Sequence, residues 1–395
     1  MENIAYYLVS CPIVEVSRQP QIRREPTMAV INGYIYSRDA LSYIAKQEYS
    51  ASIAFPSMAS NDTPAAVQAG YWYYQGDLAV EKIDFRLFTH LFAAFADVDS
   101  TYAVTFPIKY KSQFEDFPKT VKSKKSGIKA LLSIGGDTDH STLASMVSQP
   151  DSRQTFIQSS VRLALDNQYD GISLHWLSPN TTEEMANLGT FLIEWRHYLS
   201  LSTNCIPPFL TAAVLYSSKD LSSLKYPIQA INSLDWINVV AYDIYTPVSS
   251  SITLTGPHAP LYNATCGELS VDAGVRAWID AGVAPNKLVL GLPFFGRSWV
   301  LKYANNHAIF SPACGAANDL DQIPYKKIVE RNPVKGVDPS YVTSYCYDGT
   351  AWIAYDGKFA ISTKAIYAKL KGLRGYFAWH LGGDTSEWTL STAGN

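Results

Sequence analysis

From about residue 69 onward, short apolar runs rich in β-branched and aromatic residues alternate with longer stretches of helical spacing. Each run carries little charge, as expected for a strand covered on both faces, and the alternation is typical of repeated βα units. Eight strands of this kind favour a closed (β/α)8 TIM barrel over an open sheet. The eight runs are Ala69–Tyr74, Phe88–Phe95, Lys129–Ile134, Gly171–Trp176, Phe209–Leu215, Trp236–Ala241, Lys287–Phe294 and Gly375–Trp379.

Helix boundaries can be read at two places between these runs. Thr181 and Glu184 have the spacing of a capping box, and apolar residues follow at helical intervals. Gly282 is placed to end another helix. The apolar residues of the first helix are Met185, Leu188, Leu192, Trp195 and Leu199.

Two segments do not follow the βα alternation. The gap between the seventh and eighth runs is too long for a crossover, and it contains strand-like pieces, so residues 298–360 are predicted to form a small α+β insertion within the barrel. Residues 1–66 have no sustained period, and Ser57–Pro64 has the composition of a linker. We expect 1–66 to be an N-terminal extension, flexible or processed, and 67–395 to be the barrel.

The bulk composition excludes several function classes. The chain has 395 residues, 47% of them hydrophobic and 17% charged, with a formal net charge of -3. That charge gives no general attraction to nucleic acid, and the one basic cluster, Lys119–Lys129, is typical of a solvated helix face. No stretch approaches the roughly 20 apolar residues of a membrane helix. We therefore expect neither a nucleic-acid nor a membrane partner.

Cysteines and sequons bear on compartment and cofactors. The five cysteines, at positions 11, 205, 266, 314 and 346, form no C-x-x-C pair, so we expect no metal and no cofactor. N-x-S/T sequons begin at Asn61, Asn180 and Asn263, as in a secreted glycoprotein. The apolar stretch Ile4–Val16 is a poor signal peptide because Glu2 stands where a basic region is usual. The expected compartment is extracellular or vacuolar.

The fourth predicted strand carries the most specific motif. It reads Asp170-Gly-Ile-Ser-Leu-His-Trp-Leu-Ser-Pro179 and resembles the D-G-x-D-x-D-W-E-Y-P segment of glycoside hydrolase family 18, in the form found in plant class V chitinases. Other segments fit the same family in the same order, so the resemblance spans roughly residues 68–390. These segments are Ala69–Trp72, Phe92–Asp97, Ser133–Gly136, Ala241–Tyr245 and Gly375–His380.

The resemblance implies a substrate-assisted hydrolysis, in which the acetamido oxygen of the sugar acts as nucleophile and the protein supplies one acid. In the family that acid is the glutamate of the motif, supported by two aspartates. Leu177 stands at the glutamate position, and Ser173 and His175 stand at the two aspartate positions. The first aspartate of the motif is kept as Asp170.

Strand geometry predicts where the side chains of these departing residues point. Residues two apart share a face, so Ser173, His175 and Leu177 should project together into the barrel mouth, whereas Asp170 has the other parity and a structural role. Leucine cannot donate a proton, and general acid catalysis typically contributes about 10²–10⁴-fold. Glu183 and Glu184 follow Pro179 and open the next helix, so neither is expected to replace the missing acid.

The residues that would hold a sugar match the family pattern more closely than the residues of the acid motif do. By resemblance, Tyr242 and Asp243 match a pair that bonds the N-acetyl group, and Trp379 matches the aromatic floor under the sugar. Tyr71 and Tyr245 are further candidate contacts. Thr246 departs from a glycine that is common in the family.

Three hypotheses follow. The first is a non-hydrolytic, lectin-like protein that binds chitin or other N-acetylglucosamine-containing glycans. The second is an enzyme with altered chemistry that uses His175, together with Asp243, for proton transfer. The third is a residual chitinase that uses an unexpected acid. The sequence predicts no metal ligands beside His175 and leaves the oligomeric state open.

Overall fold

The computed structural model describes residues 28–31, 34–37, 66–202, 208–218, 224–247, 253–263, 269–317, 322–331 and 333–395. The chain divides into two units, Met1–Met58 and Ala59–Asn395. In the first unit, β1 (Met28–Ile31) pairs antiparallel with β2 (Tyr34–Ser37). The sequence analysis did not anticipate this hairpin, although Asn-Gly between two apolar runs, as at positions 32 and 33, is a recognised hairpin signal.

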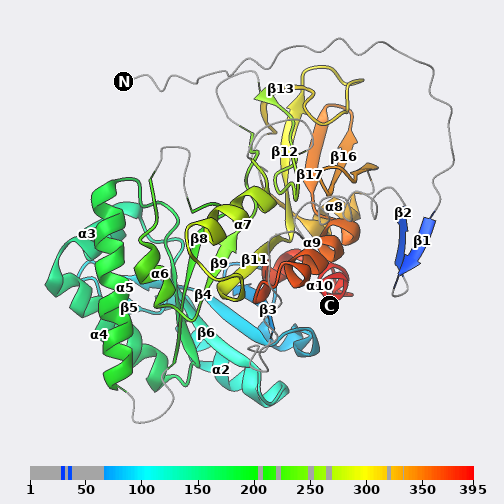
Figure 1. Ribbon diagram of the computed structural model, residues 1–395. Helices are drawn as coiled ribbons and strands as arrows, with labels where there is room; N and C mark the ends of the chain where they lie inside the picture. Colours follow the sequence, from blue (N-terminus) through cyan, green and yellow to red (C-terminus); the bar gives the residue numbers. More distant parts are fainter. Residues whose placement is uncertain are drawn as a thin grey trace. The chain divides into compact units, whose positions relative to one another are not determined.

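The second unit contains the predicted barrel. Its strands run parallel in the order β3-β18-β11-β9-β8-β7-β6-β4, and pairing of β3 with β4 closes the ring (Figure 1). All eight predicted runs are confirmed as barrel strands. They are β3 (Val67–Tyr73), β4 (His90–Val98), β6 (Lys129–Gly135), β7 (Gly171–His175), β8 (Phe209–Leu215), β9 (Trp236–Val240), β11 (Leu288–Pro293) and β18 (Gly375–Trp379).

Helices separate the strands, as the alternating pattern requires. The α-helices of the barrel are α2 (Lys111–Lys124), α3 (His140–Ser148), α4 (Pro150–Asp166), α5 (Thr182–Ser202), α6 (Ile228–Asn232), α7 (Val271–Asp280), α9 (Lys358–Leu370) and α10 (Thr389–Gly394). Short 3-10 turns are η1 (Val80–Lys82), η2 (Phe85–Leu87), η3 (Ile108–Tyr110), η4 (Pro285–Lys287) and η5 (Leu381–Gly383). The short strand β5 (Val104–Thr105) pairs antiparallel with β4.

The two predicted helix boundaries are confirmed. At the start of α5 the Glu184 backbone N–H donates to the Thr181 hydroxyl at 3.0 Å, and the Glu184 carboxylate accepts from the Asn180 backbone N–H at 2.7 Å. These bonds satisfy groups that a helix start leaves without intrahelical partners. Gly282 follows the end of α7 with a φ of 102°, a left-handed conformation that glycine adopts without strain.

The insertion between barrel strands β11 and β18 is also confirmed. Its antiparallel sheet has the order β10-β13-β12-β17-β16-β15, with β14 paired to β12. It begins at Phe295, earlier than the predicted residue 298, because β12 follows β11 after one residue. The elements of the insertion are β12 (Phe295–Leu301), β13 (Pro312–Ala316), β14 (Gln322–Pro324), α8 (Tyr325–Glu330), β15 (Val334–Asp338), β16 (Thr343–Asp348) and β17 (Ala351–Tyr355). The short strand β10 (Thr253–Leu254) comes from the segment between β9 and α7 and joins this sheet by pairing with β13.

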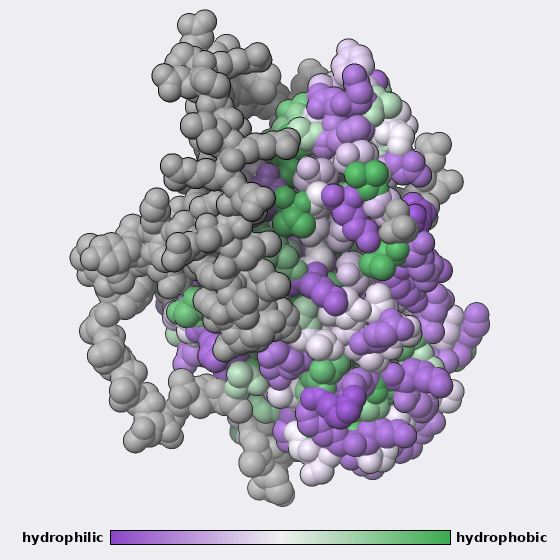
Figure 2. All heavy atoms as spheres, turned by 90° about the vertical axis from the view of Figure 1, so that its right-hand side faces the viewer, coloured by the Kyte–Doolittle hydropathy of each residue, from purple (hydrophilic) through white to green (hydrophobic). Residues whose placement is uncertain are grey.

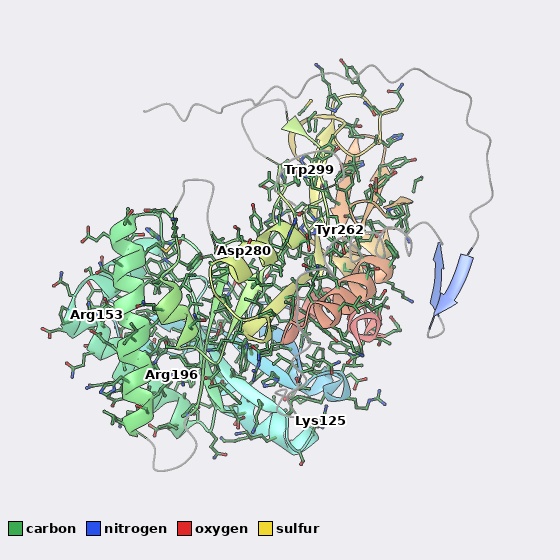
Figure 3. The ribbon with its side chains drawn as sticks, viewed as in Figure 1. Lys125, Arg153, Arg196, Tyr262, Asp280 and Trp299 are labelled. Carbon is green, nitrogen blue, oxygen red and sulfur yellow. The ribbon has the colours of Figure 1, made fainter. Side chains whose placement is uncertain are left out.

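The barrel and the insertion each have an aromatic core. In the insertion, Trp299 and Trp352 are fully buried with ring centroids 5.4 Å apart, and Figure 3 shows Trp299 in this sheet. On the face seen in Figure 2, hydrophilic residues predominate and hydrophobic ones lie in small separate groups. Among the described residues, no helix combines the length and apolar character needed to cross a bilayer.

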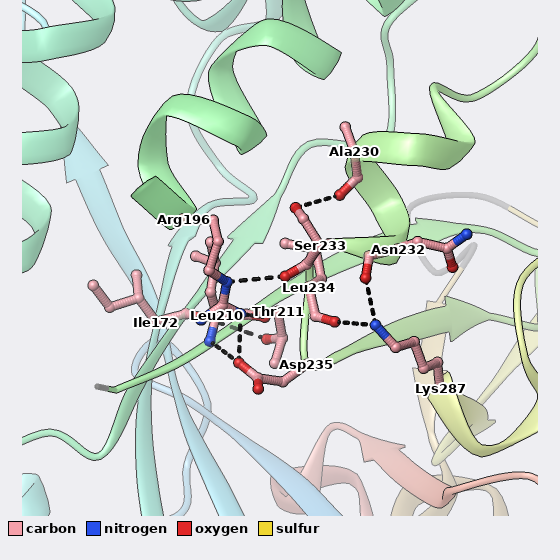
Figure 4. Close-up of polar contacts among 10 residues, drawn as sticks. All are labelled: Ile172, Arg196, Leu210, Thr211, Ala230, Asn232, Ser233, Leu234, Asp235 and Lys287. Atoms are coloured by element: carbon pink, nitrogen blue, oxygen red, sulfur yellow. Dashed lines mark hydrogen bonds and ion pairs between the residues drawn. The ribbon is translucent and has the colours of Figure 1, made fainter. Parts of the chain in front are cut away.

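Polar side chains tie the strands together at their amino-terminal ends. Asp235 accepts a hydrogen bond from the Leu210 backbone N–H at 2.8 Å and from Arg196 at 2.6 Å, and Lys287 donates to the Leu234 carbonyl at 2.8 Å (Figure 4). Asp170 links the start of β7 to β6 in the same way, because its carboxylate accepts a hydrogen bond from the Ala130 backbone N–H at 2.9 Å. This end of a TIM barrel serves stability, whereas the opposite end carries the chemistry.

A buried ion pair connects α9 to the strand that ends the insertion. Lys364 donates to Asp356 and to the Ala259 carbonyl oxygen, and the two charged side chains are 1% and 0% exposed. Removing one member of such a pair leaves an uncompensated buried charge.

We predict that Lys364→Met lowers the free energy of unfolding by about 3–5 kcal/mol, measured by urea denaturation. Lys327→Met is the matched control, because Lys327 and Glu330 form a 2.9 Å pair that is 53% and 59% exposed. Lys327→Met should lower the free energy of unfolding by less than about 1 kcal/mol. Equal effects of the two substitutions would contradict this prediction.

Candidate functional site

An aromatic cluster forms the floor of the barrel mouth. Trp379, the last residue of β18, is partly exposed, and its ring is stacked on Phe95 with centroids 5.4 Å apart. The ring centroids of Tyr71 and His175 lie 5.3 and 5.8 Å from the ring centroid of Trp379. These four side chains come from different strands, so the floor exists only once the barrel has closed.

Ser173 and His175 of β7, and Leu177 just after it, contact the core cluster inside the barrel. Ser173 is fully buried beside Tyr71, His175 contacts Tyr71 and Phe95, and Leu177 packs against the same core cluster. The Ser173 hydroxyl has no hydrogen-bond partner among the described residues. The Leu177 side chain is hydrocarbon and partly buried against that cluster.

His175 is enclosed by aromatic rings. Its centroid lies 4.7 Å from that of Phe95, and within the described chain its Nδ1 makes no hydrogen bond. Burial lowers the pKa of His175 to about 4, because a charged imidazole is poorly solvated in this setting. The ring is neutral at neutral pH and has no proton to donate as an imidazolium acid.

Tyr71, a predicted sugar contact, is part of the buried core of the barrel. It is fully buried, and its hydroxyl accepts a 2.7 Å hydrogen bond from Asn238, whose own carboxamide oxygen accepts from Trp236 at 3.0 Å. Burial raises the pKa of Tyr71, so the phenol stays protonated. The Tyr71 ring makes edge contacts with His175 and Trp379, with centroids 6.2 and 5.3 Å apart.

Asp243 is the most strongly held carboxylate at the mouth. It follows β9 with a φ of 59°, and its two oxygens each accept a 2.7 Å hydrogen bond from Arg297 of β12. The Nδ1 atom of fully buried His258 lies 3.5 Å from the same carboxylate. A bidentate contact of this kind fixes the direction of a carboxylate as well as its charge.

These contacts determine the ionisation of Asp243. Burial alone would raise the pKa of the carboxyl, but the Arg297 guanidinium and the His258 imidazole outweigh burial and lower it to about 2. Asp243 is thus a permanent anion and a poor proton donor. Its neighbour Tyr242 is 6% exposed, and its ring contacts Phe295 and Phe377.

Tyr245 lies further out than the Tyr242–Asp243 pair. It is partly exposed, and its ring packs edge-on against Phe310 of the insertion at 5.6 Å. The candidate contact therefore belongs to the junction between the barrel and the insertion. A Cβ at Gly256 would meet the Tyr245 Cβ at 2.8 Å, so this close approach requires glycine.

Sequence reasoning missed a polar group on the opposite side of the floor. The Tyr73 hydroxyl donates to Asp137 at 2.9 Å, and the Tyr73 ring lies 5.8 Å from Trp379. Burial raises the pKa of Asp97 and of Asp137, and the charge of Asp137 raises that of Asp97 further. A signal was available, because both aspartates follow barrel strands at their carboxyl ends.

The residue types of the mouth do not suggest a metal site. Within the part of the chain that the structure describes, no three His, Cys, Asp or Glu side chains are grouped to hold a metal ion. Of the cysteines, Cys314 and Cys346 lie in this part and are unpaired, while positions 11, 205 and 266 lie outside the described residues.

Fold and site together define a TIM-barrel protein with an α+β insertion and an aromatic floor at its mouth. The family model of glycosyl hydrolases family 18 matches residues 67–384. The chain belongs to this family.

Similar proteins include active enzymes by name and a lectin by name. A class V chitinase of Arabidopsis thaliana is 43% identical over 328 residues, which cover 80% of this chain and 86% of the relative. Nod factor hydrolase protein 1 of Medicago truncatula is 37% identical over 350 residues, which cover 83% of this chain and 89% of the relative. A class V chitinase mutant of Nicotiana tobaccum in complex with NAG4 is 39% identical, with a TM-score of 0.79 and coverage of 83% and 97%. A chitinase-like agglutinin of Robinia pseudoacacia is 40% identical, with a TM-score of 0.77 and coverage of 83% and 98%.

The low pKa of Asp243 predicts acid sensitivity. A carboxyl whose folded pKa is below its unfolded value stabilises the fold above the unfolded value, 3.8, and loses that stabilisation as pH falls towards about 2. We expect a contribution of about 2 kcal/mol, which Asp243→Asn removes, so unfolding free energy should depend less on pH between about 4 and 2.

Urea unfolding at several pH values measures the slope of the unfolding free energy against pH. Asp116→Asn is the control, because Asp116 is 66% exposed on α2. Asp243→Asn also lowers stability at neutral pH by removing the carboxylate that pairs with Arg297, so the change of unfolding free energy with pH is the informative quantity. A slope equal to that of the parent protein would contradict the prediction.

Proposed function

We propose that this protein binds N-acetylglucosamine oligosaccharides without hydrolysing them. The observation that carries the proposal is Leu177, a hydrocarbon side chain at the position of the family's acid, packed against an otherwise complete aromatic floor. Asp243 and Tyr242 remain beside that floor as polar groups for an acetamido sugar. A cleft of this kind retains stacking and hydrogen bonding, whereas proton transfer to the leaving oxygen is lost.

The residues nearest to the missing acid are poor replacements. Glu184 is engaged at the start of α5, where it also lies 3.5 Å from His140. His175 is neutral at neutral pH, and Asp243 is held as an anion. The altered-chemistry hypothesis uses His175, with or without Asp243, for proton transfer, and the pKa values of both groups lie well below neutrality.

Similar proteins support a carbohydrate ligand and differ in activity. One solved relative is in complex with NAG4, and a chitinase of Cycas revoluta, 32% identical with a TM-score of 0.78 and coverage of 83% and 98%, is in complex with (GlcNAc)3. The Robinia relative is a chitinase-like agglutinin. Loss of the acid favours the agglutinin-like role for this chain.

Binding is tested by calorimetry with chitotetraose. We expect measurable affinity in the parent protein, and at least about tenfold weaker binding in Trp379→Ala, because a central aromatic side chain contributes more than most contacts. Tyr303→Ala is the control, since Tyr303 is 53% exposed in the insertion, and it should bind like the parent. No binding at millimolar chitotetraose would reject the proposal.

Hydrolysis is tested with a fluorogenic chitooligosaccharide. We expect no release by the parent, and little by Leu177→Glu, because Ser173 and His175 replace the carboxylates that support the acid in the family. Clear turnover by the parent would favour the residual-chitinase hypothesis. Asp137→Asn would then identify the acid, since Asp137 is a carboxylate of raised pKa on the loop next to Leu177.

A further inference from the structure

An exposed glycosylation sequon follows barrel strand β7. Asn180, Thr181 and Thr182 form an N-x-T tripeptide without proline, and all three residues are exposed. Such a tripeptide accepts an N-linked glycan, which is bulky and requires an asparagine at the surface of the folded protein. The sequons at Asn61 and Asn263 are not wholly within the described residues, so the sequon at Asn180 is the one whose setting the structure gives in full.

The position of Asn180 places such a glycan beside the aromatic floor. Asn180 lies between β7, which ends at His175, and α5, and this end of a TIM barrel is the mouth. Leu177, which packs against the same core cluster as Trp379, precedes Asn180 by three residues. The Cα atoms of Leu177 and Asn180 are therefore at most about 11 Å apart, since an extended chain spans up to ~3.6 Å per residue. A glycan on Asn180 would begin at the rim of the mouth.

Hydrogen bonds hold the backbone of this segment and leave the Asn180 side chain weakly engaged. The Asn180 backbone N–H donates to the Glu184 carboxylate, and the Glu184 backbone N–H donates to the Thr181 hydroxyl. His140, at the start of α3, lies 3.1 Å from the Ser178 hydroxyl. The Asn180 amide nitrogen is 3.4 Å from His140 Nε2, which is long for a hydrogen bond. The amide can therefore carry a sugar without loss of a strong contact, on a backbone that stays fixed.

We propose that Asn180 carries an N-linked glycan and that this glycan competes with free oligosaccharides for the mouth of the barrel. An N-linked glycan begins with two N-acetylglucosamine residues, the sugar proposed above as ligand. Attachment at the rim raises the local concentration of these two sugars beside the floor. The modification is independent of the proposed function, whereas the competition rests on it, since both ligands use the same floor.

Peptide mass spectrometry tests the modification. The full chain is produced in plant leaf tissue, and its peptides are compared before and after treatment with a peptide N-glycosidase, which converts a glycosylated asparagine to aspartate. We expect this conversion at Asn180 in the parent and in Thr182→Ser, which keeps the sequon. We expect none in Thr182→Ala, which removes the sequon at the first residue of α5. An unmodified Asn180 in the parent protein would overturn the proposal.

Calorimetry with chitotetraose tests the competition. Thr182→Ala and Asn180→Gln both remove the glycan, so we expect each to bind at least about threefold more tightly than the parent. Thr182→Ser should bind like the parent. Because the two glycan-free variants differ from the parent at different residues, a shift common to both is assigned to the glycan and not to either side chain.

The outcomes separate this inference from the proposed function. If Asn180 is glycosylated and all four proteins bind chitotetraose equally, or if only one of the two glycan-free variants binds more tightly, the competition is overturned and the proposed function stands. If only the glycan-free variants bind, both the competition and the proposed function are supported. If no protein binds, both fail, while mass spectrometry decides the modification by itself.

Discussion

The bidentate contact between Asp243 and Arg297 is the interaction on which the site most depends. It joins the end of barrel strand β9 to β12, the first strand of the insertion, with two 2.7 Å hydrogen bonds. Because Asp243 is largely buried, its charge is tolerable only while Arg297 and His258 remain beside it. The contact therefore orients a polar group toward the mouth and fixes the insertion against the barrel.

A second constraint comes from the aromatic floor. Trp379, Phe95, Tyr71 and His175 are contributed by four strands and contact one another within 6.2 Å. A histidine in this cluster is neutral, and a leucine two residues further along is compatible with it.

Charge is distributed unequally around the mouth. On one side Asp243 is neutralised by Arg297, while on the other side Asp97 and Asp137 have no cationic partner among the described residues. A sugar chain that lies across the floor would meet a neutralised polar pair at one place and net negative charge at another.

The alternation of apolar runs with helical spacing in the sequence determined the barrel, its eight strands and the insertion. The motif of the fourth strand determined which residues stand at the family's acid positions. Both are local properties of the chain, as are strand parity and helix capping. Asp170 was correctly assigned a structural role from parity alone, and it accepts from the Ala130 backbone N–H. The N-terminal hairpin was missed, although its Asn-Gly signal is local. Only the tertiary structure decided that the Tyr71 ring contacts Trp379, that Arg297 binds Asp243, and that the charge of Asp137 acts on Asp97. Those contacts join residues 40 to 308 positions apart, and burial and pairing at such separations depend on how the barrel closes and where the insertion rests.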